Sequence, residues 1–131
     1  MNIKELQIGN WVAYYDSHSR ICCIDARFNN VILDFDKTYC IDAPYIEPIA
    51  IAPAILLHNK ITREERGEVL KHPTYPLEKW LIHTTFKDTW LWFNGYSQEW
   101  HLHDCNGQPL KYVHQLQNAL QLNGIDKDIN L

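Results

Sequence analysis

The stretch that decides the fold is "KWLIHTTFKDTWLWFNGYSQEWHLHD", residues 79–104. It contains three runs rich in aromatic and β-branched residues, which are typical of β-strands. Lys87-Asp88 follows the first run and Asn94-Gly95 the second, and both pairs favour turns. The sequence therefore predicts a three-stranded antiparallel meander. The three runs occupy residues 79–86, 89–94 and 99–104.

The two turns also predict which side chains share a face of this sheet. A two-residue turn at Lys87-Asp88 would place His83 opposite Trp92, and a loop over residues 95–98 would place Trp92 opposite His101. Neighbouring residues of a strand point to opposite faces, so this register sorts the side chains into two sets. The expected core face holds Trp80, Ile82, Phe86, Leu91, Phe93, Trp100 and Leu102. The opposite face holds His83, Thr85, Trp90, Trp92, His101 and His103.

The opposite face is the predicted binding face. Two tryptophans carry roughly 300–500 Å² of surface, which is a large area to leave in water. Exposed apolar patches of a few hundred Å² mark contact sites in many proteins. We expect this face to be covered either by the C-terminal helix or the first barrel, or by a ligand or partner. The candidate binding residues are His83, Trp90, Trp92, His101 and His103.

His101 and His103 also suggest a metal site, because they share one side of a strand and could chelate one ion. A zinc site needs three or four ligands, and His83 is expected two strands away with Trp92 between. Cys105 is the remaining candidate ligand. The sequence favours an aromatic–imidazole face without metal or other cofactor. The alternative is a metal-dependent hydrolase that uses His101, His103 and a carboxylate such as Asp104.

The first half of the chain predicts another β-meander. Its strands are expected at residues 10–15, 20–26 and 29–36, with turns at 16–19 and at Asn29-Asn30. Short strands with tight turns are typical of a small barrel of the SH3-like kind. This is a prediction about fold, which by itself assigns no activity.

Helical segments are predicted in the middle and at the end of the chain. Pro53 can open a short helix, and Thr62 has capping-box spacing to Glu65 for a second helical segment. A longer C-terminal helix is expected between Pro109 and Gly124, with His114 on its polar side as a solvated or capped residue. We predict an α+β protein with a single compact domain over residues 1–131. Its two sub-structures are expected at residues 1–50 and 51–131.

The composition limits the classes of function. The chain has 131 residues, 46% of them hydrophobic, and a net charge of −4, which disfavours nucleic-acid binding. Its four cysteines include no CxxC pair, and this pattern favours a reduced, cytoplasmic protein over a zinc knuckle. No apolar window is long enough to predict a membrane span.

The catalytic patterns that sequence can reveal are missing. The five glycines are scattered, so no phosphate-cradling loop is predicted. The serines lie in predicted turns and outside any nucleophile-elbow phrase. We therefore predict a non-catalytic protein that binds a protein partner or associates with itself. A nucleic-acid-binding SH3-like module is the remaining alternative.

Three phrases, "ELQIGNWV", "YIEPIAIAPAILLHN" and "YVHQLQNALQLNG", occur in this order along the chain. Together they resemble a family of small proteins found in Bacteroidetes and their prophages, whose activity is unknown. The shared residues are Leu6 to Asn10, Glu47 to Ile49, and His114 to Asn118. The resemblance implies an accessory role linked to a mobile element and implies no chemistry.

Overall fold

The computed structural model describes residues 1–34, 37–42, 45–63, 77–86, 88–102 and 109–131. It is an α+β fold with a curled antiparallel sheet that forms half a barrel, a second antiparallel sheet and two α-helices. The chain divides into two compact units. Unit 1 comprises residues 1–50 and 112–118, and unit 2 comprises residues 51–111 and 119–131. Each unit is therefore discontinuous in sequence.

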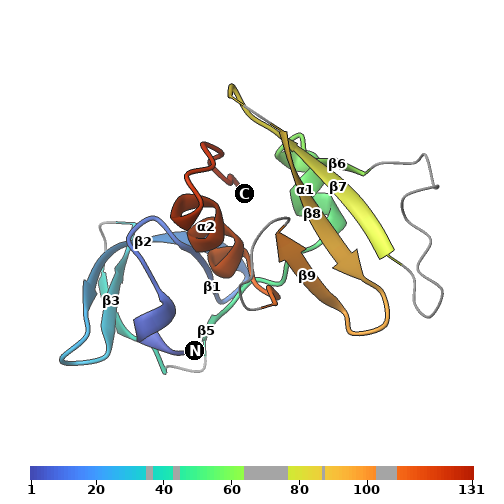
Figure 1. Cartoon of the computed structure of the whole chain (residues 1–131). Coiled ribbons are helices and arrows are strands. Elements are labelled where there is room, and N and C mark those ends of the chain that lie inside the picture. Colours follow the sequence, from blue (N-terminus) through green and yellow to red (C-terminus); the bar gives the residue numbers. More distant parts are fainter. Residues whose placement is uncertain (35–36, 43–44, 64–76, 87, 103–108) are drawn as a thin grey trace. The chain divides into compact units, whose positions relative to one another are not determined.

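Unit 1 is built on a five-stranded sheet with the strand order β4-β3-β2-β1-β5 (Figure 1). The three strands predicted in this half are present, and β4 and β5 extend the sheet on its two edges. A one-turn 3₁₀ helix, η1 (Ile3–Glu5), precedes them. The strands are β1 (Trp11–Tyr14), β2 (Ser17–Asp25), β3 (Asn30–Leu33), β4 (Lys37–Cys40) and β5 (Ile46–Glu47).

Aliphatic side chains on the concave side of this sheet form the core of unit 1. Alternating residues of β3 are buried, as the period of a strand requires. A β-bulge between Ile21 and Cys23 changes the register of β2 and increases its local twist. The core consists of Ile3, Leu6, Val12, Ile21, Val31, Leu33, Ile41 and Ile46.

The two terminal phrases of the family resemblance meet in unit 1. Gln117 accepts a hydrogen bond from the backbone N–H of Trp11 at 2.9 Å and donates one to the carbonyl of Gly9 at 3.0 Å. Asn118 accepts from the Asn10 amide at 2.8 Å. Gly9 has a φ of +94°, a conformation that glycine adopts without strain. The Gln117 amide therefore satisfies two backbone groups, and Asn118 adds a contact between side chains.

The middle phrase also contacts the start of the C-terminal helix, through backbone hydrogen bonds. The N–H of Val113, the first residue of helix α2 (Val113–Leu122), donates to the carbonyl of Ile49 at 2.8 Å. Ala50 and Tyr112 form an isolated antiparallel bridge. All three phrases thus have a structural role in closing unit 1.

We expect Gln117→Ala to lower the free energy of unfolding by about 1–3 kcal/mol, because it removes the amide that hydrogen-bonds to the Trp11 N–H and to the Gly9 carbonyl. Gln121→Ala, at an exposed position of the same helix, is the matched control and should change stability by less than about 0.5 kcal/mol. Chemical denaturation followed by circular dichroism measures both. Equal losses in the two variants would contradict the role of Gln117.

Unit 2 is built on a four-stranded sheet with the order β6-β7-β8-β9. Its core side chains come from alternating positions of these strands and from both helices. The strands are β6 (Thr62–Arg63), β7 (Leu77–His83), β8 (Asp88–Asn94) and β9 (Glu99–Leu102), and helix α1 spans Pro53–His58. The buried residues include Leu56, Ile61, Trp80, Ile82, Leu91, Trp100, Leu102, Leu110, Leu120 and Ile129.

The predicted pairing of β8 with β9 is confirmed, whereas the predicted pairing of β7 with β8 is wrong. Trp92 lies opposite His101, as expected, but Lys79 takes the place expected for His83 opposite Trp92. The cause is the turn: β7 ends at His83 and β8 begins at Asp88, so the connection between the strands is longer than the predicted two-residue turn. The register of β7 differs from the predicted one by an even number of residues. Each side chain of β8 and β9 therefore stays on its predicted face of the sheet.

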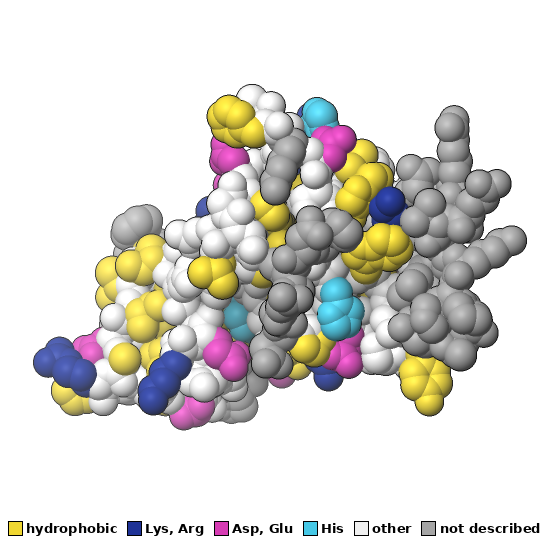
Figure 2. Space-filling view, in the orientation of Figure 1, with side chains coloured by type: hydrophobic (Ala, Val, Ile, Leu, Met, Phe, Trp, Pro, Cys, Tyr) yellow, Lys and Arg dark blue, Asp and Glu magenta, His cyan; other side chains and the backbone are white. Residues whose placement is uncertain are grey.

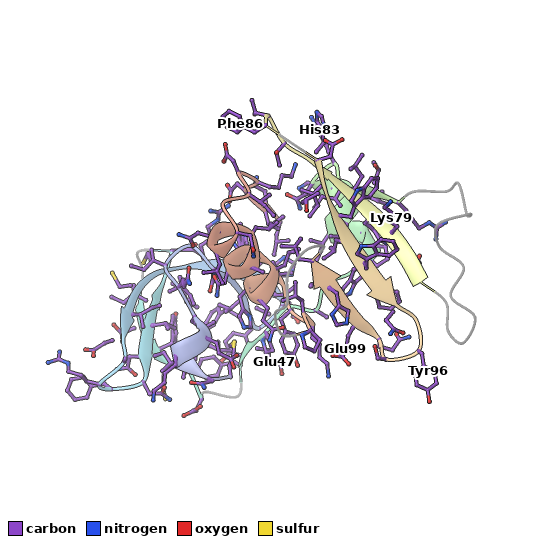
Figure 3. The ribbon with its side chains drawn as sticks, viewed as in Figure 1. Glu47, Lys79, His83, Phe86, Tyr96 and Glu99 are labelled. Atoms are coloured by element: carbon purple, nitrogen blue, oxygen red, sulfur yellow. The ribbon has the colours of Figure 1, made fainter. Side chains whose placement is uncertain are left out.

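Phe86 was expected in the core and is 88% exposed. It lies beyond the end of β7, near the tip of the hairpin (Figure 3). Thr85 also lies in this loop and takes no part in the sheet. The longer loop therefore removes both residues from the faces to which the sequence assigned them.

The helices agree with the prediction in part. Helix α1 opens at Pro53 as expected, but Thr62 pairs with Leu81 in a strand instead of capping a helix. Helix α2 begins at Val113, four residues after Pro109, because Leu110 is held in a bridge with Trp100. Its predicted C-terminal end is confirmed, with Gly124 just beyond it at a φ of +66°.

His114 was expected to be solvated or capped on the polar side of the helix, but it is only 1% exposed. Neither ring nitrogen has a hydrogen-bond partner in the part of the chain that the structure describes. The ring stacks on Tyr112, with the centroids 5.8 Å apart. Burial lowers the pKa of His114 below its ordinary value, while the nearby Glu5 carboxylate acts in the opposite direction.

Candidate functional site

The candidate site is the face of the second sheet that carries Trp90 and Trp92. The register places Leu81 opposite Trp90, and it places Trp92 between Lys79 on β7 and His101 on β9. Cross-strand partners share a face, so these five side chains form one continuous surface. We call this surface the Trp–His face and define it as Lys79, Leu81, Trp90, Trp92 and His101.

Lys79 gives the Trp–His face a positive centre that the sequence analysis missed. Its ammonium lies 3.7 Å from the centroid of the Trp90 ring and 5.4 Å from that of Trp92. Both distances are within the range of a cation–π interaction, in which the negative ring face attracts the charge. The protein thus covers part of its exposed indole surface with its own lysine. Figure 3 shows Lys79 over the middle of the sheet.

The Trp–His face is accessible to solvent. Both tryptophans are half-buried and His101 is exposed. In Figure 2, hydrophobic side chains gather around a basic side chain over the region of β7–β9, with a histidine beside them. The opposite side of the same strands is core, where Trp80 and Trp100 are buried. Indole rings on an accessible face retain the chemistry for contact with a partner.

His83 lies apart from the tryptophans. It pairs with Asp88 at the end of the hairpin, and its Nδ1 contacts the Asp88 carboxylate. The predicted contact between His83 and Trp92 is therefore wrong, although both side chains project from the same face of the sheet. The carboxylate partner gives His83 a local role in closing the β7–β8 loop.

The predicted metal site falls mostly outside the described residues. His103, Asp104 and Cys105 are not among them, so only His101 of the proposed ligands can be placed. Within the described ranges, no group of three or more His, Cys, Asp or Glu side chains is arranged to hold a metal ion. Cys22, Cys23 and Cys40 form no disulfide with one another, and the Cys22 thiol donates a hydrogen bond to the carbonyl of Ile32 at 3.2 Å.

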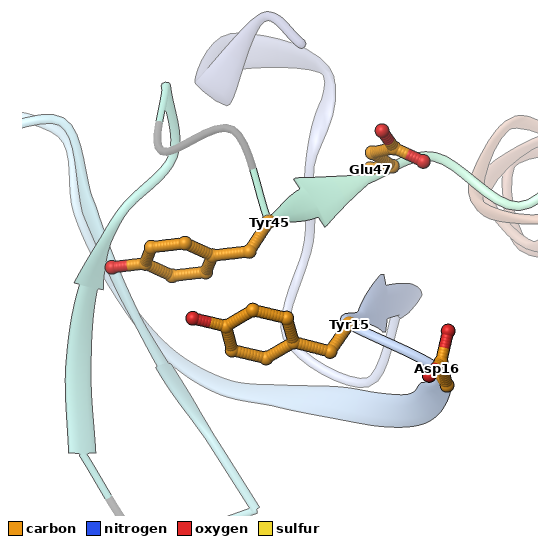
Figure 4. Close-up of a pocket in the computed structure, with 4 residues that line it drawn as sticks. All are labelled: Tyr15, Asp16, Tyr45 and Glu47. Atoms are coloured by element: carbon orange, nitrogen blue, oxygen red, sulfur yellow. The ribbon is translucent and has the colours of Figure 1, made fainter.

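A pocket in unit 1 is a second candidate site, and the sequence analysis missed it. It has a volume of about 380 Å³ and lies where the β1–β2 turn approaches β5. Figure 4 shows the rings of Tyr15 and Tyr45 one above the other, with Asp16 and Glu47 toward one end. The tyrosine pair at residues 14–15, followed by Asp16, was the only local signal, because Tyr45 and Glu47 lie about thirty positions further along the chain.

Tyr15 and Tyr45 belong to a larger cluster of four tyrosines. Their rings stack at 15° with centroids 5.0 Å apart. Tyr14 and Tyr39 pack beneath them, within 6.1 Å of a neighbouring ring. Tyr14, Tyr39 and Tyr45 also contact the core, whereas Tyr15 is 66% exposed.

Comparison with protein-family models, with curated proteins and with solved structures gives no match. Among the described residues, no helix has the length and apolar character needed to cross a membrane. The Trp–His face and the pocket at Tyr15 are therefore the two surfaces from which a function can be inferred.

Proposed function

We propose that this chain is a non-catalytic protein-binding module that recruits an acidic protein partner through the Trp–His face. The observation that carries this proposal is the half-buried pair Trp90 and Trp92, which stands on an accessible sheet face beside a lysine and a histidine. Tryptophan is enriched among the residues that dominate binding energies at protein interfaces.

The charge of the Trp–His face supports an acidic partner. Lys79 supplies a positive charge at its centre, and His101 supplies an exposed imidazole at its edge. A partner carboxylate could pair with Lys79 while an apolar side chain packs against the indoles. Such complementary charges select partners and accelerate their association.

Two further points belong to this proposal. We propose an SH3-like barrel for unit 1, supported by five short antiparallel strands in a curled sheet. We also propose membership of the Bacteroidetes and prophage family, supported by the three phrases that meet in this unit. An accessory role in a mobile element would follow from that membership, and a cytoplasmic location is proposed from the cysteine pattern.

The test is capture of partners by the tagged full-length chain and by Trp90→Ser/Trp92→Ser from a lysate of the source cell. We expect one or a few proteins to be retained by the original chain and depleted at least about tenfold with the double variant. Lys79→Glu should weaken the same capture, because it reverses the charge that faces the partner.

Tyr96→Ser is the matched control, since it removes an exposed aromatic ring from the β8–β9 turn, outside the Trp–His face. Thermal melts establish that each variant folds. Capture that survives in the folded double variant would contradict the proposal. Unfolding of Lys79→Glu and of each single tryptophan variant would also contradict it, because the Trp–His face would then be needed for the fold. Sedimentation of the purified chain distinguishes a second copy from a different partner.

A further inference from the structure

We propose that the pocket lined by Tyr15, Asp16, Tyr45 and Glu47 binds an alkylammonium group, either on a lysine-derived side chain or as a free quaternary amine. This site is in unit 1 and is independent of the function proposed for the Trp–His face. Its evidence is the combination of exposed π surface, two exposed carboxylates and open volume at one place.

The tyrosines supply the attractive ring surface. Tyr15 stacks on Tyr45 and leaves much of its ring in solvent. The face of an aromatic ring attracts a cation, and weakly hydrated alkylammonium groups are bound by aromatic clusters in other proteins. Tyr39 and Tyr45 meet at 81°, and Tyr14 and Tyr45 at 89°, so the rings beneath Tyr15 hold Tyr45 in place from its edges.

The carboxylates supply the charge. Among the described residues, neither Asp16 nor Glu47 has an ion-pair partner. They come from the β1–β2 turn and from β5, so they approach the pocket from different segments. This arrangement suits a compact ammonium better than a guanidinium, which binds carboxylates through a planar fork.

At other aromatic rings the chain supplies its own cations. Where tryptophan rings are exposed, the chain places its own cations on them, as with Lys79 on Trp90 and Arg20 on Trp11. None of the described lysines or arginines makes this contact with Tyr15 or Tyr45. The pocket therefore combines aromatic rings and acidic groups with no cation from the described chain.

The backbone also holds Tyr15 in an uncommon conformation. Its φ is +51°, in the left-handed region that non-glycine residues rarely occupy. The N–H of Tyr15 donates to the carbonyl of Tyr45 at 3.0 Å, which fixes the turn against β5. This hydrogen bond brings the two stacked residues together and holds Tyr15 at the mouth of the pocket.

The experiment is an NMR titration of the full chain with three probes. Choline and Nα-acetyl-trimethyl-lysine amide carry the cation, and 3,3-dimethylbutan-1-ol has the shape of choline without its charge. We expect both cations to shift the amide signals of Tyr15, Asp16 and Tyr45, with the neutral alcohol about tenfold weaker. Tighter binding of the lysine derivative would indicate a peptide side chain as the source, and equal binding would indicate a free amine.

Variants test the assignment to this pocket. Tyr15→Ala and Asp16→Asn/Glu47→Gln should each weaken choline binding by about tenfold, whereas Tyr96→Ala should leave it unchanged. These substitutions are at the surface, and their spectra report whether the fold persists. Equal binding of the neutral alcohol, binding retained in folded Tyr15→Ala, or no shift up to about 20 mM choline would each overturn the proposal.

Discussion

Trp100→Ala is expected to lower the free energy of unfolding by about 3–5 kcal/mol, whereas Trp92→Ala is expected to cost only about 1 kcal/mol. The two residues are close neighbours on adjacent strands, but they project from opposite faces. Trp100 is buried against Trp80 and Phe93, with ring centroids 6.0 Å and 4.6 Å away. Its removal would leave a cavity between these rings, which the rigid sheet could fill only in part.

Trp92 has no comparable burial, because one side of its ring faces Lys79 and solvent. Urea denaturation followed by far-ultraviolet circular dichroism measures both variants without dependence on tryptophan emission. Equal destabilisation by the two substitutions would show that both faces are core, and the Trp–His face would then lose its functional interpretation. Retained stability in Trp100→Ala would contradict the sheet register.

Acid is expected to destabilise the protein through His114. Because burial lowers the folded-state pKa of this histidine, the unfolded chain binds a proton first as the pH falls. The stability that neutral His114 contributes is therefore fully present above the unfolded-state pKa of about 6.5, and it is lost progressively as the pH falls below that pKa. The slope from this one group is at most about 1.4 kcal/mol per pH unit, down to the folded-state pKa.

His114→Phe should remove this acid dependence, because it keeps a flat ring against Tyr112 and cannot bind a proton. It also removes two buried nitrogens that have no partner among the described residues, which should offset part of the strain from its larger ring. Denaturation at several pH values between 5 and 7.5 gives the slope. The control is His58→Phe, which removes an exposed imidazole. A slope that persists in His114→Phe and disappears in His58→Phe would contradict this assignment.

Local patterns were sufficient to predict most elements and the two-sided character of the second sheet. The strands around Trp92, the short helix at Pro53 and the helix end before Gly124 all depend on neighbouring residues, so sequence alone could indicate them. The predicted faces of the β8 and β9 side chains are correct although the predicted register of β7 is wrong, because a register shift by an even number of residues leaves each side chain on its face.

The predictions that were wrong or missing concern features that depend on contacts between residues distant in the sequence or on side-chain contacts that periodicity does not encode. The β7–β8 turn lengthens because His83 pairs with Asp88, a contact that strand periodicity does not encode. His114 occupies a polar position in the helix pattern, yet unit 1 buries it. The tyrosine pocket depends on β5 lying beside β1, a pairing between segments about thirty residues apart that single-sequence patterns did not reveal.

The division of helix α2 between the two units has a practical consequence for dissection. Residues 113–118 complete unit 1, and the residues that follow return to unit 2, so no single cut separates the chain into two whole pieces. An expressed fragment of residues 1–50 would lack the amides of Gln117 and Asn118 that close its amino-terminal loop. Gene truncations at this boundary would therefore yield two incomplete polypeptides, and separate assays of the two surfaces require point substitutions in the intact chain.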